Sequence, residues 1–119
     1  MITGQKRSQK QEAHLAKVYG GSVTPGSGNG WVYKNDVMTP TLSIEAKYTD
    51  AKSYSLKLAD LLKAEKIALI DGRDSIFTVS FSGEEFVILR EEDYRAMRMK
   101  LEAFREPEHF PSRYARGGW

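Results

Sequence analysis

The spacing of apolar and polar positions along the chain predicts helices and strands in an irregular order. Apolar residues at three- and four-residue intervals predict helices over residues 6–19, 54–70 and 90–104. Shorter apolar or alternating runs predict strands over residues 31–37, 42–48, 76–81 and 86–89. Only a short turn separates the strands of each pair, so each pair is expected to form an antiparallel hairpin. This order predicts an α/β protein with a mixed sheet and flanking helices, not an alternating βαβ chain.

The strand expected over residues 42–48 carries two different faces. Side chains of a strand point to opposite sides in turn, so its apolar residues share one face, and these are Leu42, Ile44 and Ala46. The opposite face carries Ser43, Glu45 and Lys47. We therefore expect a central strand with one face in the core and the other in a polar environment.

Length and composition restrict the class of protein. A chain of 119 residues with 40% hydrophobic residues suits one folded domain, here expected over residues 1–119 with a loose tail from about residue 106. No apolar run approaches the roughly 20 residues that span a bilayer, and the polar N-terminus does not resemble a secretory signal. There is no cysteine, so any metal must be bound by oxygen or imidazole ligands. These features predict no membrane association and an intracellular location.

Charge adds a possible partner. The net charge is only +2, but basic residues concentrate in the first two thirds of the chain, where a phosphate backbone could bind. Judged by charge alone, a solvated surface with charges of both signs is the better interpretation. The candidate phosphate contacts are Lys6, Arg7, Lys10, Ser27, Asn29, Lys52 and Ser53. Ser27 and Asn29 could instead only form the glycine-rich turn, and Ser53 could instead cap the following helix.

Candidate chemistry lies at Asp36, Glu45 and Lys47. Eight residues separate Asp36 from Glu45, and a tight hairpin of that length brings both carboxylates to one end of a small sheet. Two close carboxylates are costly unless a cation lies between them, and Mg²⁺ prefers oxygen ligands. Lys47 lies about 7 Å along the same strand face, where it could orient or help deprotonate a water, or stabilise charge on a phosphate. The alternative is a surface hairpin with an ordinary ion pair.

These residues resemble a known signature. Asn35-Asp36-Val37, followed by Leu42-Ser43-Ile44-Glu45-Ala46-Lys47, resembles the PD-(D/E)xK motif of nucleases, with Asn35 in place of the proline. The continuation from Tyr48 to Leu56, with Lys52-Ser53-Tyr54, is similar to phage and archaeal Holliday-junction resolvases. Their glycine loop before the Asp is matched by Ser27-Gly28-Asn29-Gly30. The resemblance covers about residues 6 to 90.

The resemblance implies a restriction-endonuclease-like mixed sheet with an αβββαβ core. It implies that Glu12, on the first helix, joins Asp36 and Glu45 in binding Mg²⁺, for which Mn²⁺ is expected to substitute. Glu12 could otherwise be a solvated helix residue. Lys47 would complete the catalytic set of an endodeoxyribonuclease that cuts branched DNA as a homodimer, in a prokaryote or a phage-infected cell. The alternatives are another nuclease of this superfamily (nicking, mismatch or end-processing) and a catalytically silent DNA-binding subunit.

Overall fold

The computed structural model describes residues 4–25 and 34–105. The chain divides into two compact units, residues 1–89 and residues 90–119. The described elements of the first unit are α1 (Gly4–Tyr19), β1 (Ser22–Val23), β2 (Val37–Met38), β3 (Leu42–Thr49), α2 (Leu58–Ile70), β4 (Asp74–Phe81) and β5 (Glu84–Ile88). The second unit contains α3 (Glu91–Ala103). The expectation of a single domain over 1–119 stays a prediction.

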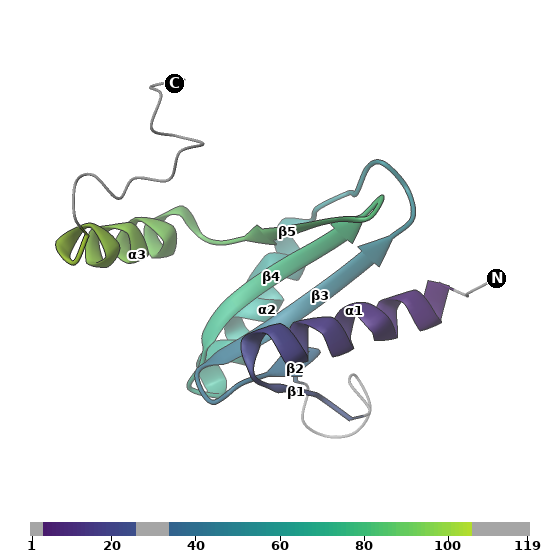
Figure 1. Ribbon diagram of the computed structural model, residues 1–119, viewed down its shortest axis with the longest axis horizontal. Helices are drawn as coiled ribbons and strands as arrows, with labels where there is room; N and C mark the ends of the chain where they lie inside the picture. The colour runs from purple at the N-terminus through teal and green to yellow at the C-terminus, as the bar shows by residue number, and fades with distance from the viewer. Residues whose placement is uncertain (1–3, 26–33, 106–119) are drawn as a thin grey trace. The chain divides into compact units, whose positions relative to one another are not determined.

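The first unit is built on a mixed sheet with strand order β1-β2-β3-β4-β5 (Figure 1). Neighbouring strands are antiparallel except β3 and β4, which run parallel over their whole length, from Leu42 opposite Asp74 to Thr49 opposite Phe81. Parallel neighbours need a long crossover connection, and α2 provides it. The α/β class with a mixed sheet and flanking helices is therefore confirmed, and β3-α2-β4 forms one βαβ unit within it.

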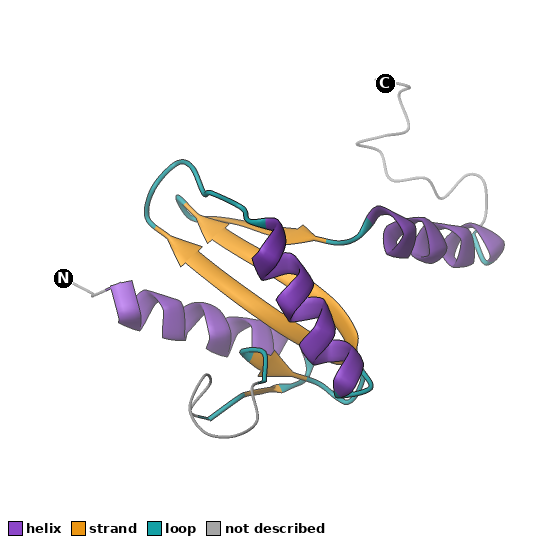
Figure 2. Ribbon diagram, turned by 180° about the vertical axis from the view of Figure 1, so that it is seen from behind, coloured by secondary structure: helices purple, strands orange, loops and turns teal. Residues whose placement is uncertain are grey.

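The two faces of the sheet carry separate apolar clusters. Leu15 and Ala16 of α1 pack with Val37, Ile44 and Ala46 on one face. On the other face, Ala64 of α2 packs with Phe77 and Val79 of β4. Figure 2 shows α2 crossing the near face, with α1 on the far side. The predicted apolar face of residues 42–48 is therefore confirmed, because α1 covers Ile44 and Ala46.

The register places the polar face of β3 under α2. Glu45 lies opposite Phe77 and Lys47 opposite Val79, and laterally paired residues of a sheet point to the same side. Phe77 and Val79 contact the α2 side, so Glu45 and Lys47 belong to that side as well. Glu45 and Lys47 therefore lie on the face of the sheet that α2 covers.

The structure differs from the prediction of a strand over residues 31–37. Residues 31–33 lie outside the described residues, residues 34–36 have no regular structure, and only Val37 and Met38 form a strand. Asn35 is 1% exposed, and its side chain bonds to other elements. Hydrogen bonds from a polar side chain can compete with the backbone pairing of a strand, and Asn35 makes such side-chain bonds to Ser43 and Ala64.

Helix α2 begins later than the pattern predicted. Its first residue is Leu58, whereas the apolar spacing predicted a start at residue 54. Tyr54 instead packs against the cluster of Ala64, Phe77 and Val79, in a segment without regular structure that leads into the helix. Tertiary packing of one aromatic ring thus outweighs helical periodicity over the first turn.

The second unit contributes a charged helix. The first turn of α3 carries Glu91, Glu92 and Asp93, where the helix dipole favours acids. Exposed ion pairs join Arg95 to Glu91 and Arg98 to Glu102 along it. Within 4–25 and 34–105, no helix has both the length and the apolar character needed to cross a bilayer.

Candidate active site

Asp36 and Glu45 meet at the junction of β2 and β3. Val37 lies opposite Ile44 in the antiparallel register, so Asp36, one residue earlier, comes beside Glu45. The backbone N–H of Ala46 donates to Oδ2 of Asp36 at 2.9 Å, which fixes this carboxylate against β3. The two carboxyl groups share a hydrogen bond. The fold therefore brings together the two acids that the sequence singled out, although by a much shorter hairpin than expected.

The closeness of the two acids changes the ionisation of Glu45. The pKa of Glu45 is raised to about 8, first by burial, then by its hydrogen bond with Asp36 and by the negative charge of Asp36. Lys47 lowers this pKa again, with Nζ 3.5 Å from Oε2 of Glu45, but not enough to cancel the increase. At neutral pH Glu45 therefore keeps its proton in most molecules of the metal-free protein. A bound cation would favour the ionised form of Glu45.

Lys47 is held as a cation. Burial lowers its pKa, but the charges of Glu45, Tyr54 and Asp60, and its hydrogen bond with Glu45, outweigh burial and raise it overall. An ammonium group with a raised pKa stays protonated at neutral pH. The positive charge of Lys47 therefore suits stabilisation of negative charge on a phosphate better than removal of a proton from water.

Glu12 approaches from α1. Its side chain is half-buried, and its pKa is raised by burial and by the charge of Asp36, while a hydrogen bond with Ser8 lowers it. Helix α1 therefore places a third carboxylate within electrostatic range of Asp36.

The donor set is suitable for a hard divalent cation, although it is incomplete. Within residues 4–25 and 34–105, no three His, Cys, Asp or Glu side chains lie close enough together to hold a metal ion. Mg²⁺ commonly takes one or two protein carboxylates and keeps several waters. Asp36 and Glu45 supply such a pair of oxygen donors in contact. Glu12 lies near enough to add charge, so the residues fit Mg²⁺ as a partly hydrated ion.

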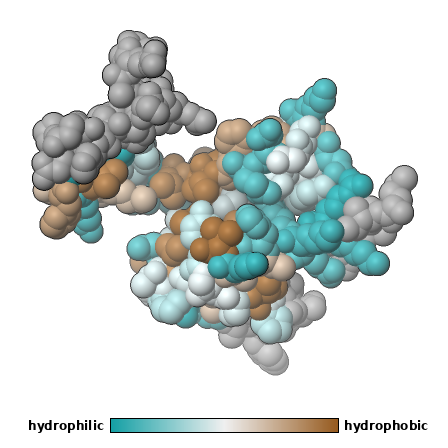
Figure 3. All heavy atoms as spheres, viewed as in Figure 1, coloured by the Kyte–Doolittle hydropathy of each residue, from teal (hydrophilic) through white to brown (hydrophobic). Residues whose placement is uncertain are grey.

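The candidate phosphate contacts divide into described and undescribed residues. Arg7 pairs with Asp50 at 2.5 Å, and the hydroxyl of Tyr48 donates to the same carboxylate. Figure 3 shows hydrophilic residues gathered over the N-terminal half of α1 and the loop after β3. That surface includes the remaining described candidates, Lys6, Lys10, Lys52 and Ser53. Ser27 and Asn29 lie outside the described residues.

The alternative role of Ser53 as a helix cap is wrong. Helix α2 begins at Leu58, and the residue at its N-cap is Lys57, whose side chain makes no capping hydrogen bond. Ser53 lies in the exposed loop four residues earlier. Its hydroxyl is therefore available to a partner at the surface.

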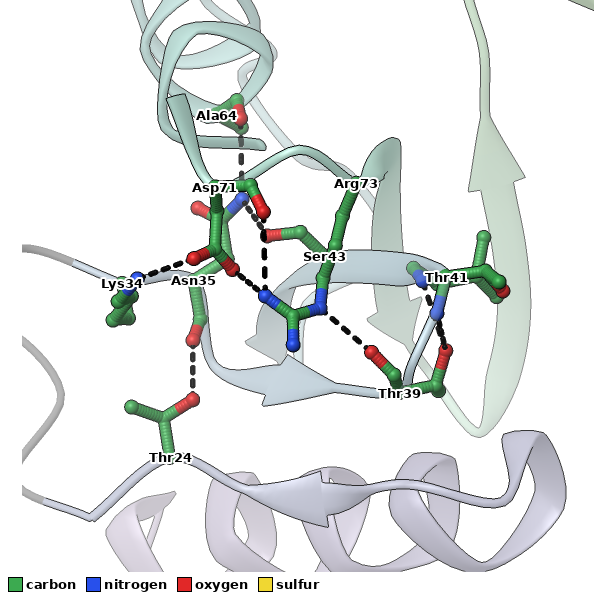
Figure 4. A network of polar contacts seen from close by, with 10 residues as sticks. Thr24, Lys34, Asn35, Thr39, Thr41, Ser43, Ala64, Asp71 and Arg73 are labelled. Carbon is green, nitrogen blue, oxygen red and sulfur yellow. Dashed lines mark hydrogen bonds and ion pairs between the residues drawn. The ribbon is translucent and has the colours of Figure 1, made fainter. Parts of the chain in front are cut away.

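Two buried amides of the site were missed by the sequence pattern. Gln11 is 5% exposed and donates from Nε2 to the carbonyl of Lys47 at 2.9 Å. Asn35 donates from Nδ2 to Oγ of Ser43 and to the carbonyl of Ala64, as Figure 4 shows. The only sequence signal was position, since each amide directly precedes an acid, Glu12 or Asp36. Comparison with models of protein families, with curated proteins and with solved structures finds no match to this chain, so its function must be inferred from this geometry.

Proposed function

We propose that this chain is a metal-dependent endodeoxyribonuclease of the PD-(D/E)xK type. The observation that carries the proposal is the contact between Asp36 and Glu45 beside the ammonium of Lys47. Burying two carboxyl groups against each other destabilises the ionised protein unless a cation is bound. A cation site beside a fixed positive charge is what hydrolysis of a phosphodiester needs.

Each residue has a distinct part in this chemistry. A bound Mg²⁺ lowers the pKa of a water ligand and polarises a phosphoryl oxygen. Asp36 and Glu45 supply the anionic oxygens that would hold the ion. The backbone N–H of Ala46 orients Asp36 for this. Glu12 adds negative charge near Asp36. Lys47, kept protonated by Glu45, stabilises charge that develops on the phosphate.

The substrate is proposed to be branched duplex DNA, cut by a homodimer. The surface of α1 and the loop after β3 presents Lys6, Arg7, Lys10 and Lys52 to solvent or to exposed acids, suited to successive phosphates. The stretch from Tyr48 to Leu56, which resembles the sequence of Holliday-junction resolvases, begins in the last two residues of the strand that carries Glu45 and Lys47 and continues into the loop after it. Symmetric cutting of a four-way junction needs two active sites, which a two-fold dimer provides.

A cleavage assay tests this proposal. Purified protein is incubated with a four-way junction, a linear duplex of the same sequence and supercoiled plasmid, with Mg²⁺, with Mn²⁺ or with EDTA. We expect junction cleavage only with a divalent metal. Asp36→Asn and Glu45→Gln should abolish cleavage and still bind the junction in a gel-shift assay, because the phosphate contacts lie elsewhere. Asp93→Asn, an exposed acid of α3, is the matched control and should cut normally.

Each other outcome has a definite meaning. Normal cleavage by either variant of the acidic pair would show that the assigned residue does not hold the metal. Equal cutting of linear duplex would point to a nicking, mismatch or end-processing nuclease. Binding without cleavage in either metal would contradict the enzyme and indicate a DNA-binding subunit.

A further inference from the structure

Asp36 lies outside the regular strands, so something other than a ladder must hold it against β3. The residue before it, Asn35, is 1% exposed. Its Nδ2 donates to Oγ of Ser43 on β3 at 2.8 Å and to the carbonyl of Ala64 on α2 at 3.1 Å (Figure 4). One side-chain amide thus links the irregular segment to the strand that carries Glu45 and to the helix above it.

The backbone around Asn35 is fixed as well. Thr24, just after β1, donates from Oγ1 to the carbonyl of Asn35 at 2.7 Å and from its backbone N–H to the carbonyl of Asp36 at 2.8 Å. Lys34 forms an ion pair with Asp71 at the end of α2 at 2.5 Å. Residues 34–36 are therefore anchored on several sides, and the side-chain amide of Asn35 is a buried anchor one residue before Asp36.

Gln11 repeats this arrangement on α1. It is 5% exposed and directly precedes Glu12. Its Nε2 donates to the backbone carbonyl of Lys47 on β3 at 2.9 Å. Leu15 and Ala16 of α1 also pack on the sheet, and such small and aliphatic side chains fix the distance of a helix better than its rotation. The hydrogen bond from Gln11 to β3, together with the ion pair of Arg7 with Asp50, therefore fixes the rotation of α1 that brings Glu12 near Asp36.

Both amides bear an unsatisfied acceptor. Oε1 of Gln11 and Oδ1 of Asn35 are buried with no hydrogen-bond partner among the described residues. A buried acceptor without a partner destabilises a fold, whereas an apolar side chain of similar size would not. Stability alone therefore does not explain these residue types, and the contribution of each amide lies in what its N–H groups orient.

We propose that Asn35 and Gln11 are positioning residues of the active site. The amide of Asn35 sets Asp36 against β3, and the amide of Gln11 sets Glu12 beside it. Neither residue touches substrate, and each acts through the acid that follows it. The role of these acids as metal ligands rests on the proposed function, but the geometry that the amides impose does not.

The test has one arm that needs neither metal nor DNA. The N–H of Ala46 donates to Oδ2 of Asp36, so its hydrogen exchange, followed by ¹⁵N NMR in EDTA, reports where Asp36 lies. Asn35→Ala should speed exchange at Ala46 by about tenfold, the loss expected for a hydrogen bond to a charged group. Gln11→Ala should leave Ala46 unchanged. Ser80→Ala, a buried polar residue of β4, is the control and should also leave it unchanged.

The second arm measures the metal requirement. The Mn²⁺ concentration for half-maximal junction cleavage should rise about tenfold in Asn35→Ala and by a smaller factor in Gln11→Ala, as for other residues that orient metal ligands. Saturating Mn²⁺ should restore the cleavage rate to within about threefold of wild type, because the ligands themselves remain. A purely structural role would lower the melting temperature and leave the metal requirement of the folded protein unchanged.

The outcomes separate this inference from the proposed function. Wild-type exchange at Ala46 in Asn35→Ala, or a uniform rise at every amide, would overturn the positioning role of Asn35. An unchanged metal requirement in Gln11→Ala would overturn that of Gln11. If Asn35→Ala does not fold, Ser43→Ala removes one of its two acceptors and must speed exchange at Ala46 by a smaller factor. A wild-type protein that neither binds Mn²⁺ nor cuts DNA would refute the nuclease, while the Ala46 arm would still decide the role of Asn35.

Discussion

Replacing Glu45 with glutamine should remove a pH dependence of stability that the buried acidic pair creates. In the metal-free fold the pKa of Glu45 is raised to about 8 by burial and by Asp36, from an ordinary value of 4.5. Between these two pH values the folded protein keeps a proton that the unfolded chain has released. The free energy of unfolding must therefore fall as pH rises through this interval, because the folded state binds more protons than the unfolded state.

The magnitude follows from the size of the shift. Each pH unit between the two pKa values lowers the free energy of unfolding by about 1.4 kcal/mol, so the full interval sets an upper limit of about 5 kcal/mol. The side chain of Glu45 is 22% exposed, and water screens part of this effect. We expect a loss of roughly 2–3 kcal/mol between pH 5 and pH 8 from this residue. Glutamine does not ionise, so Glu45→Gln should lack this loss.

Urea denaturation in EDTA measures the difference. Unfolding curves of wild type and Glu45→Gln are recorded at pH 5, 6, 7 and 8, and the free energies in water are compared at each pH. Glu92→Gln makes the same chemical change at an exposed site of α3 and should follow wild type. Excess Mn²⁺ should stabilise wild type more at pH 8 than at the lower pH values, because the largest fraction of Glu45 is ionised there.

Parallel curves for wild type and Glu45→Gln from pH 5 to 8 would refute the reasoning. They would show that Glu45 ionises in the folded protein as it does in the unfolded chain. The carboxyl groups of Asp36 and Glu45 would then not press against each other, and the physical basis for a cation site between them would be lost.

Three further substitutions test the fold and its surface. Ile44→Ala empties a position that is 0% exposed and should lower the free energy of unfolding by about 2–5 kcal/mol in urea titrations, and a smaller loss would contradict its place in the core. Gly21→Ala would press a methyl group onto the backbone carbonyl of Met38 and should destabilise by about 1–3 kcal/mol, whereas unchanged thermal unfolding would disprove this close approach. Arg7→Ala removes an exposed ion pair with Asp50 and should leave the urea midpoint almost unchanged, because water screens such pairs. The same variant should weaken junction binding and reduce its salt dependence by about one unit of slope, and an unchanged slope would exclude a phosphate contact.

The sequence by itself determined which side chains share a face of β3, the strand that carries Glu45 and Lys47. Period-two alternation assigned Ile44 and Ala46 to one face and Glu45 and Lys47 to the other, and the structure has that division. Such a pattern follows from strand geometry within a single segment, so no distant residue is needed to predict it.

Only the tertiary structure decided how the segments meet. The parallel pairing of β3 with β4 through α2, and the burial of Asn35 that keeps residues 34–36 out of a strand, depend on contacts between segments distant in the chain. The approach of Glu12 to Asp36 likewise depends on how α1 lies on the sheet. The spacing of apolar residues in a segment does not depend on which strand or helix packs against it, so the spacing cannot predict the packing partner. The packing that selects the partners also forces the carboxyl groups of Asp36 and Glu45 together.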